Sequence, residues 1–260
     1  MTRIVQLTDL HLTARKGRRV RGSDVWANLD QTLAHVRSHV GDFDRLVLTG
    51  DLANSGSAEA YARLADVLAP WHSRLRLVPG NHDHRERLRA AFPAWWPPGR
   101  PSLCFHDHAG GYRLIGLDSV CQGRTRGQLG RWQLDWLAQQ LRSERDPVLL
   151  FLHHPPERVH CWWLDKDLLR DRAELATITA PCDVRAIFAG HVHQDNHTRS
   201  GGAEVWTTPA VAYEYRPGSW LPLACSRQPA FRVIEAGPTT VSSRVVRPWE
   251  HRSGGAAEWR

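Results

Sequence analysis

The sequence is poor in cysteine, has a single methionine and contains no long apolar run. Its five cysteines are odd in number and widely spaced, and none belongs to a Cys-x-x-Cys pair. A disulfide framework or a structural zinc knuckle is therefore not expected. No stretch reaches the roughly 18 apolar residues of a membrane span, and the opening "MTRIVQLTDLH" lacks a signal-peptide core. We expect a protein of the reducing cytoplasm without a membrane partner.

Internal repeats and dividing linkers are also absent from the sequence. A chain of 260 residues is long enough to bury a large core, and 42% apolar with 23% charged residues is typical of globular proteins. We therefore expect a single domain over residues 1–248. The last residues, 249–260, are rich in glycine and polar side chains, and we expect them to form a flexible tail.

Basic residues outnumber acidic ones, with a formal net charge of +7 and a pI near 9.6. Such a balance favours anionic partners. The densest run is "ARKGRRVR", Ala14 to Arg21, which we call the basic loop. A short charge run is most often a solvated surface, but this one follows closely on Asp9 and His11. It could steer anions toward them, and its role stays open at this point.

Short apolar runs alternate with segments of helical periodicity, which indicates a layered α/β domain. Helices are expected over residues 23–40, 57–69 and 127–141. The last of these places Leu129, Trp132, Trp136, Leu137 and Leu141 on one buried face. The part of the chain after about Glu204 should complete or edge a second sheet. The predicted strands are residues 4–7, 45–48, 75–78, 112–117, 148–152, 184–188, 204–208, 230–234 and 240–246.

Five of these strands are followed by side chains that can bind metals. In open α/β sheets the carboxyl ends of the strands form the edge at which ligands bind. A single aspartate there is usually a turn or cap residue, and a single histidine usually belongs to the core. Five strand ends in succession that each carry such a side chain are not explained by turn, cap or core roles. They are Asp9 and His11; Asp51; Asn81, His82 and Asp83; His153 and His154; and His191 and His193.

The mixture of carboxylate, amide and imidazole donors suits Mn, Fe, Co or Zn. Asp51 lies between the other candidates in the sequence, and its carboxylate could bridge two ions. Paired divalent metals clamp the attacking and leaving oxygens of an in-line displacement and make hydroxide available near neutral pH. The charge of two divalent cations exceeds the negative charge of Asp9, Asp51 and a bridging hydroxide. Such a centre therefore keeps a net positive charge, which suits a phosphate.

The ordered set D-x-H, GD, GNHD, H and GHxH resembles the calcineurin-like metallophosphoesterases. The resemblance implies a four-layer α/β/β/α sandwich with a dimetal site at the carboxyl edge of its strands. It also implies that His82 faces the phosphate and either protonates the leaving oxygen or stabilises charge on the phosphoryl oxygens, and that Asp83 orients His82. One metal would be held by Asp9, His11, Asp51 and His193, and the other by Asp51, Asn81, His153 and His191. His84 is outside the pattern, and His154 is read either as a support of the ligands or as a loop histidine.

Further stretches resemble the class III cyclic nucleotide phosphodiesterases, especially the bacterial 3',5'-cyclic AMP group. They are "LHHPP" followed by "CWWLDKDLLRDRAEL", and "GHVHQD". This resemblance implies two divalent ions, most readily Fe²⁺ or Mn²⁺, with Co²⁺ or Zn²⁺ as alternatives. Metal-bound hydroxide would open the cyclic diester to the 5'-monophosphate. Segments 161–170 and 213–215 would wall the nucleotide, and its phosphate would contact His11, Asp51, Asn81, His82 and His193.

Other functions stay open on the sequence. The runner-up is a broad phosphodiesterase acting on 2',3'-cyclic nucleotides or glycerophosphodiesters. A nuclease is kept in view only by the basic loop, so a nucleic-acid partner is not expected. A non-catalytic scaffold on the same fold would typically have lost ligands, which this chain retains. A homodimer is compatible with the sequence.

Overall fold

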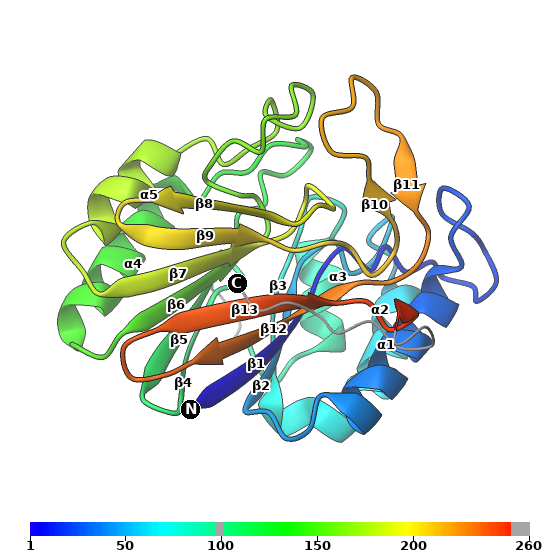
Figure 1. Cartoon of the computed structure of the whole chain (residues 1–260), viewed down its shortest axis with the longest axis horizontal. Helices are drawn as coiled ribbons and strands as arrows, with labels where there is room; N and C mark the ends of the chain where they lie inside the picture. Colours follow the sequence, from blue (N-terminus) through cyan, green and yellow to red (C-terminus); the bar gives the residue numbers. More distant parts are fainter. Residues whose placement is uncertain (97–100, 251–260) are drawn as a thin grey trace.

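The computed structural model describes residues 1–96 and 101–250 and is built on two large sheets that pack against each other (Figure 1). Of the tail expected to be flexible, residues 251–260 lie outside the described part. No described helix is both long and apolar enough to cross a bilayer.

The first sheet contains five strands. β1, β2 and β3 are parallel, with Ile4 of β1 in register with Arg45 of β2. The two C-terminal strands add antiparallel to the side of β1, in the order β13-β12-β1-β2-β3. The bounds are β1 (Thr2–Leu7), β2 (Arg45–Thr49), β3 (Leu75–Val78), β12 (Phe231–Ala236) and β13 (Val241–Val246).

The second sheet has six strands in the order β4-β5-β6-β7-β9-β8. Its four inner strands are parallel, and the edge strands β4 and β8 are antiparallel to their neighbours. A separate two-stranded ribbon pairs β10 with β11. The bounds are β4 (Phe105–Ala109), β5 (Tyr112–Leu117), β6 (Val148–Leu152), β7 (Val184–Ala189), β8 (Asn196–Ser200), β9 (Ala203–Thr207), β10 (Glu214–Tyr215) and β11 (Ala224–Ser226).

Helices cover the outer face of each sheet (Figure 1). Ser57 caps α2 by accepting a hydrogen bond from the Ala60 N–H at 3.2 Å, as expected for a serine at that position. The helices are α1 (Val25–His39), α2 (Ala58–Leu68), the 3₁₀ turn η1 (Ala69–Arg74), α3 (Arg85–Ala91), α4 (Gly130–Ser143) and α5 (Arg172–Thr179).

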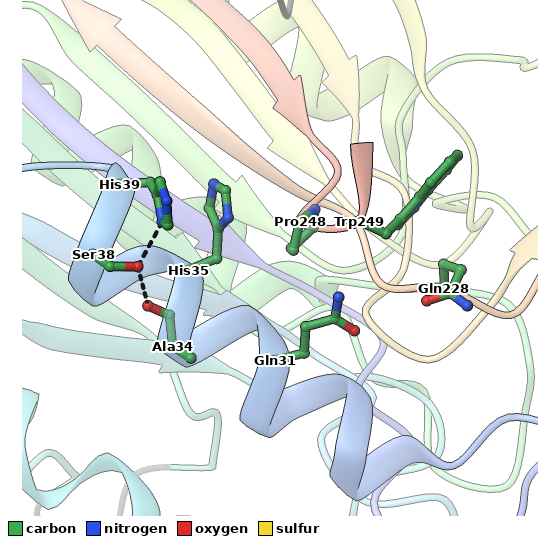
Figure 2. Close-up of a pocket in the computed structure, with 8 residues that line it drawn as sticks. All are labelled: Gln31, Ala34, His35, Ser38, His39, Gln228, Pro248 and Trp249. Atoms are coloured by element: carbon green, nitrogen blue, oxygen red, sulfur yellow. Dashed lines mark hydrogen bonds between the residues drawn. The ribbon is translucent and has the colours of Figure 1, made fainter. Parts of the chain in front are cut away.

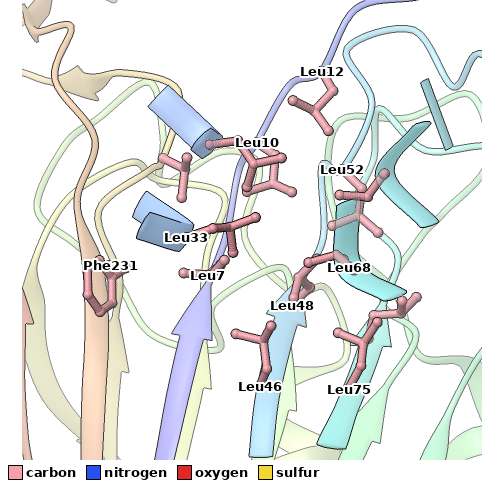
Figure 3. Packing of buried hydrophobic residues seen from close by; sticks show 14 of the residues in the cluster. Leu7, Leu10, Leu12, Leu33, Leu46, Leu48, Leu52, Leu68, Leu75 and Phe231 are labelled. Carbon is pink, nitrogen blue, oxygen red and sulfur yellow. The ribbon is translucent and has the colours of Figure 1, made fainter. Parts of the chain in front are cut away.

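Alternation along the strands produces the layers, because successive side chains point to opposite faces. Leu46 and Leu48 pack outward against the helices of the first half, as Figure 3 shows. Val47, between them, packs inward against the second sheet. In that sheet Leu150 faces α4 and α5, whereas Phe151 faces the first sheet. The predicted four-layer α/β/β/α sandwich is confirmed.

Two expectations were wrong in detail. Trp132 is 44% exposed and stacks on the outer side of Trp136, so it is not part of the buried face of α4. Leu129, Leu137 and Leu141 are buried as expected, and Leu134 joins them. Of the late strands, β9 does join the second sheet, but β12 and β13 border the first. They do so because β1 has a free side on which β12 pairs over five residues.

Candidate metal and phosphoester site

The loops after β1, β2, β3, β6 and β7 meet where the carboxyl ends of both sheets come together. This is the edge that the strand pattern predicts, and it collects side chains that are up to 184 positions apart in the chain. Every candidate metal residue from the sequence is found there: Asp9, His11, Asp51, Asn81, His153, His191 and His193.

One group of donors gathers around Asp9 and His11. The Nε2 atom of His193 lies 3.1 Å from Asp9 Oδ1 and 3.2 Å from Nε2 of His11. His11 Nε2 is also 3.6 Å from Asp51 Oδ2. Two imidazole nitrogens this close, with carboxylate oxygens on either side, converge on a common point. That arrangement can hold one cation.

A second group shares Asp51 with the first. Its Oδ1 atom lies 3.4 Å from Nε2 of His153, which in turn is 3.2 Å from Oδ1 of Asn81. The ring of His191 is 5.2 Å from that of His153, centroid to centroid. Because Asp51 presents one oxygen to each group, its carboxylate is placed to bridge two cations.

Backbone carbonyls turn two of the histidines so that Nε2 faces inward. Nδ1 of His153 is 2.8 Å from the Thr49 carbonyl, and Nδ1 of His193 is 2.8 Å from the Tyr213 carbonyl. Since a carbonyl can only accept, each Nδ1 carries the proton and donates it. Nε2 is then the nitrogen left to ligate a metal, as in histidines whose Nδ1 is held by a neighbouring acceptor.

Buried polar atoms without hydrogen-bond partners show that the donor set fits metal ions. Within the described residues, Asp9 Oδ1 and His191 Nε2 are buried and have no such partner. The other oxygen of Asp9 is satisfied, by the Thr8 hydroxyl and the His191 N–H. Leaving a buried polar atom unpaired is costly, and a cation between these atoms would remove that cost.

The carboxylates of the site are held in their charged form. Burial opposes ionisation of Asp9, but His193 and His153 outweigh it and lower its pKa to about 2. Burial likewise opposes ionisation of Asp51, and His153 keeps its pKa well below the ordinary value. Both residues therefore present negative oxygens to any cation near neutral pH.

The histidines divide into two states. Burial lowers the pKa of His11 to about 3 and that of His191 to about 3, so both are neutral and carry a free lone pair. Burial also opposes the charge on His153, but Asp51 and Asp9 outweigh it and raise its pKa to about 9. This histidine is therefore a cationic partner of the two aspartates.

Backbone strain is concentrated at the same place. Seven residues other than glycine have positive φ angles in the described part of the chain, and five of them are candidate ligands. Such conformations are uncommon outside glycine and cluster at functional sites. The five are Asp9 (52°), His11 (46°), Asp51 (50°), His191 (69°) and His193 (53°).

Two glycines are required by the close crossing of the loops. A Cβ on Gly80 would lie 2.3 Å from the Asp51 backbone nitrogen, and one on Gly190 would lie 2.7 Å from Oδ2 of Asp9. The glycine of "PGNHD" is therefore needed for space. Its φ is not in the left-handed region, so conformational freedom is not the reason.

His82 is oriented by a residue that the sequence did not single out. Its Nδ1 atom is 2.8 Å from the Asn54 carbonyl, while Nε2 faces the site 4.0 Å from Asp51 Oδ2. The side chain is 43% exposed, which leaves it open to a substrate.

The expected contact between Asp83 and His82 is wrong. The Asp83 carboxylate accepts hydrogen bonds from the Leu52, Ala53 and Gly80 N–H groups and from the Tyr61 hydroxyl. It thereby joins the loops that follow β2 and β3. Sequence reasoning missed both Tyr61 and the Asn54 carbonyl, because no residue type identifies a backbone acceptor as the partner of His82 or a helix tyrosine as the partner of Asp83.

His154 and His84 are both placed beside the site without joining it. The two ring nitrogens of His154 face the Ser119 hydroxyl and the Thr125 carbonyl, at 2.8 and 2.9 Å. Both positions are thus taken, and the ring packs against His191 at 4.6 Å. This matches the reading of His154 as a support of the ligands. His84 is half-buried and is the residue directly before α3.

An aromatic wall adjoins the donors. Tyr213 and Tyr215 are buried and lie 4.6 and 4.9 Å from the His193 ring. Trp163 packs edge-on against Tyr215. The last residue of the basic loop, Arg21, places its guanidinium 5.9 Å from the Tyr213 ring and 5.6 Å from the Tyr215 ring. The basic loop thus ends beside the site. The sequence alone left the role of this loop open.

The open hollow shown in Figure 2 is a different feature. It lies between α1 and the end of the described chain and has a volume of about 710 Å³. None of its lining residues is a candidate metal residue. They are Gln31, Ala34, His35, Ser38, His39, Gln228, Pro248 and Trp249.

Two packed sheets that deliver two adjoining groups of Asp, Asn and His donors to one edge define a hydrolase of the dinuclear-metal class. The chain belongs to the calcineurin-like phosphoesterase family, whose sequence profile matches residues 2–195. Members of this family use a dimetal centre, and the donor groups described above can hold one.

Comparison with individual proteins agrees with this assignment. The chain is 33% identical over 218 residues to the 3',5'-cyclic adenosine monophosphate phosphodiesterase CpdA of Escherichia coli K12, covering 83% of this chain and 78% of that enzyme. It is 31% identical to the enzyme of the same name from Haemophilus influenzae, over 90% and 85% of the two chains. A dimetal phosphatase from Danio rerio shares the fold, with a TM-score of 0.68, 16% identity and 95% of each chain covered.

Proposed function

We propose that this protein is a metal-dependent phosphodiesterase that hydrolyses 3',5'-cyclic AMP to 5'-AMP. The observation that carries the proposal is the identity of 31–33% to enzymes named for this reaction, over 83–90% of the chain. The convergence of the candidate donors at one edge supports the same reaction, since each sequence motif of the family contributes a side chain to the site.

Two cations would be held by the two donor groups. Asp9, His11, Asp51 and His193 form the first, and Asp51, Asn81, His153 and His191 form the second. When bound, a metal pair of this kind neutralises phosphate charge and lowers the pKa of water. The mixed oxygen and nitrogen donors suit Fe²⁺, Mn²⁺, Co²⁺ or Zn²⁺, and the resemblance to the cyclic AMP group favours the first two.

The reaction adds water to phosphorus and breaks the bond to the 3'-oxygen. His82 supplies the proton that this leaving oxygen needs, because its Nε2 points toward Asp51 while the Asn54 carbonyl holds Nδ1. Water contributes a hydroxyl to the phosphate, and the 3'-oxygen leaves as a hydroxyl, so the product is the 5'-monophosphate. Asp83 acts at one remove, by fixing the loop from which His82 projects.

Arg21 and the aromatic wall are proposed to receive the nucleotide. The substrate carries one negative charge, and Arg21 is a cation at the border of the donor groups. Trp163 and Tyr215 offer ring surfaces against which a base can pack. The five cysteines, all free thiols, support a reducing, cytoplasmic location, where a cyclic nucleotide would be met.

The test is a substrate panel with purified protein loaded separately with Mn²⁺ and Fe²⁺. The panel contains 3',5'-cyclic AMP, 2',3'-cyclic AMP, a glycerophosphodiester and an activated aryl diester, each with a chelator control. We expect chelator-sensitive conversion of 3',5'-cyclic AMP to 5'-AMP at a rate that matches or exceeds the others.

The other outcomes separate the parts of the proposal. Turnover of 2',3'-cyclic AMP or the glycerophosphodiester in preference would retain the dimetal hydrolase and reject the substrate. Turnover of nothing by metal-loaded protein would reject the catalytic roles, and would leave a scaffold on this fold.

A further inference from the structure

A second cluster of metal-capable side chains lies outside the site described above. It consists of His106 and His108 on the edge strand β4 and Glu144, the residue directly after α4. One donor atom from each of the three lies within 4.8 Å of the others. We propose that His106, His108 and Glu144 form a separate binding site for a borderline divalent cation such as Zn²⁺.

The strand geometry accounts for the pair of histidines. Residues two apart on a strand project from the same face, so His106 and His108 share one side of β4, with ring centroids 4.9 Å apart. Asp107, between them, points the other way and pairs with Arg45 and Arg76 of the first sheet. The two imidazoles are therefore directed together, away from the sheet interface.

The carboxylate comes from the end of the helix that covers this sheet. Glu144 Oε2 is 2.8 Å from Nε2 of His108. One helical turn earlier, Gln140 places its side-chain oxygen 2.9 Å from Nδ1 of His106. Gln140 in the last turn of α4 and Glu144 directly after the helix thus each meet one of the two histidines.

The state of His106 favours a metal over an ordinary hydrogen bond. Since the Gln140 oxygen accepts, Nδ1 of His106 carries the proton, which is how histidines that ligate metals are held by a neighbouring acceptor. Nε2 is then unprotonated, and it is buried without a hydrogen-bond partner within the described residues. Burial also lowers the pKa of His106, which keeps the ring neutral.

Two imidazoles and one carboxylate form a donor set that zinc proteins use, with water completing the coordination. Arg113, the nearby cation, has its guanidinium turned to the Gln140 and Asp146 carbonyls. The cluster lies where α4 ends and β6 is about to begin, which is the edge of the sheet opposite the dimetal site. A cation there would fasten the edge strand β4 to the end of α4.

The experiment counts Zn²⁺ bound to the full chain by equilibrium dialysis at a fixed free concentration, followed by metal analysis. The variants are His108→Ala and Glu144→Gln, both at exposed positions with side chains 56% and 40% accessible, so that folding is retained. The control is His197→Ala. It removes a histidine that also pairs with a glutamate, Glu204, on an edge strand, but without a second histidine.

We expect His108→Ala to bind one equivalent of Zn²⁺ fewer than the unmodified chain, and Glu144→Gln to bind that equivalent more weakly. His197→Ala should bind as much as the unmodified chain. Hydrolysis by the His108→Ala enzyme should be unchanged. Since the readout is a difference in stoichiometry, it is independent of the substrate and of the proposed reaction.

Equal zinc content in His108→Ala and the unmodified chain would overturn the proposal. An equal loss in His197→Ala would also overturn it, because zinc would then bind to exposed histidines in general. Crystals soaked in Zn²⁺ give a direct check, as an anomalous difference peak should lie between His106, His108 and Glu144.

Discussion

Among the described histidines of the site, His82 alone combines a fixed Nδ1 with an exposed side chain. Its neighbours His11 and His193 are buried, and their Nε2 atoms face each other across 3.2 Å. A histidine that is open to solvent can meet the leaving group of a substrate, whereas a buried one is out of its reach. We therefore expect the proposed proton transfer to the leaving oxygen to involve His82.

Replacing His82 by alanine should reduce kcat for cyclic AMP roughly 100- to 10,000-fold, the usual contribution of a general acid. The loss should be smaller with an activated aryl diester, whose leaving group needs no proton. Bound metal, measured by elemental analysis, should stay constant. His84→Asn is the matched control and should retain activity. Loss of a metal equivalent from the His82 variant would instead make this residue a ligand, since it also lies near His11 and Asp51.

Arg21 allows the proposed role of the basic loop in substrate binding to be tested at a single residue. Its replacement by alanine should raise KM for cyclic AMP roughly tenfold, as expected on losing one charged contact, and leave kcat nearly constant. Steady-state kinetics at two salt concentrations check this. Arg18→Ala, an exposed change in the same loop, should alter KM little. Equal effects of the two changes would mean that the loop acts through its total charge.

At the scale of elements, the site depends on how tightly the loops after β2 and β3 cross. Three backbone N–H groups and the Tyr61 hydroxyl converge on the Asp83 carboxylate, and the His82 N–H binds Asp51 Oδ1 at 2.8 Å. These contacts hold Asn81 and Asp51 in one rigid unit. The candidate metal donors that follow β2 and β3 are thus positioned both by the sheet and by contacts between the loops.

Gly80→Ala tests this crossing. The added Cβ would come within 2.3 Å of Asp51, so the loops must separate. We expect a loss of about 1–3 kcal/mol in the free energy of unfolding, typical of overpacking, together with reduced metal content and activity. Chemical denaturation and metal analysis measure both. In Gly237→Ala the nearest atom is 3.6 Å from the new Cβ, and neither quantity should change. A fully metallated, active Gly80 variant would refute the crossing as a requirement.

On the scale of the whole molecule, the two sheets are joined by a buried arginine as well as by apolar side chains. Arg232 on β12 is 2% exposed and donates to the Thr207 carbonyl at 2.9 Å and the Thr208 hydroxyl at 3.0 Å, at the end of β9 in the other sheet. It also pairs with Asp195. Because the metal donors come from both sheets, this link keeps the two halves of the site in register.

Removing the link should be costly. Arg232→Ala leaves buried acceptors and Asp195 without their donor, and we expect a loss of about 3–5 kcal/mol in the free energy of unfolding. Urea denaturation measures it. Arg131→Ala breaks an exposed pair with Asp135 and should have no measurable effect. Similar midpoints for the two variants would show that the buried arginine does not stabilise the sandwich.

Periodicity accounts for which elements the sequence predicts and which it misses. The buried strands read as apolar runs, and β1, β2, β3, β5, β6 and β7 all fall where expected. The edge strands β4 ("FHDHA") and β8 ("NHTRS") are largely polar, so their residue patterns do not distinguish them from loops. The short helices α3 and α5 bury few residues and leave little pattern.

The sequence by itself determined the order of strands and the identity of the residues that follow them, because both are local properties of the chain. From these alone the donors and their common edge could be predicted. Only the tertiary structure decided that the Asn54 carbonyl orients His82, that Asp83 holds the loops, and that Arg21 reaches Tyr213 and Tyr215. These contacts join distant segments and often use backbone atoms, which every residue carries and no residue type reveals.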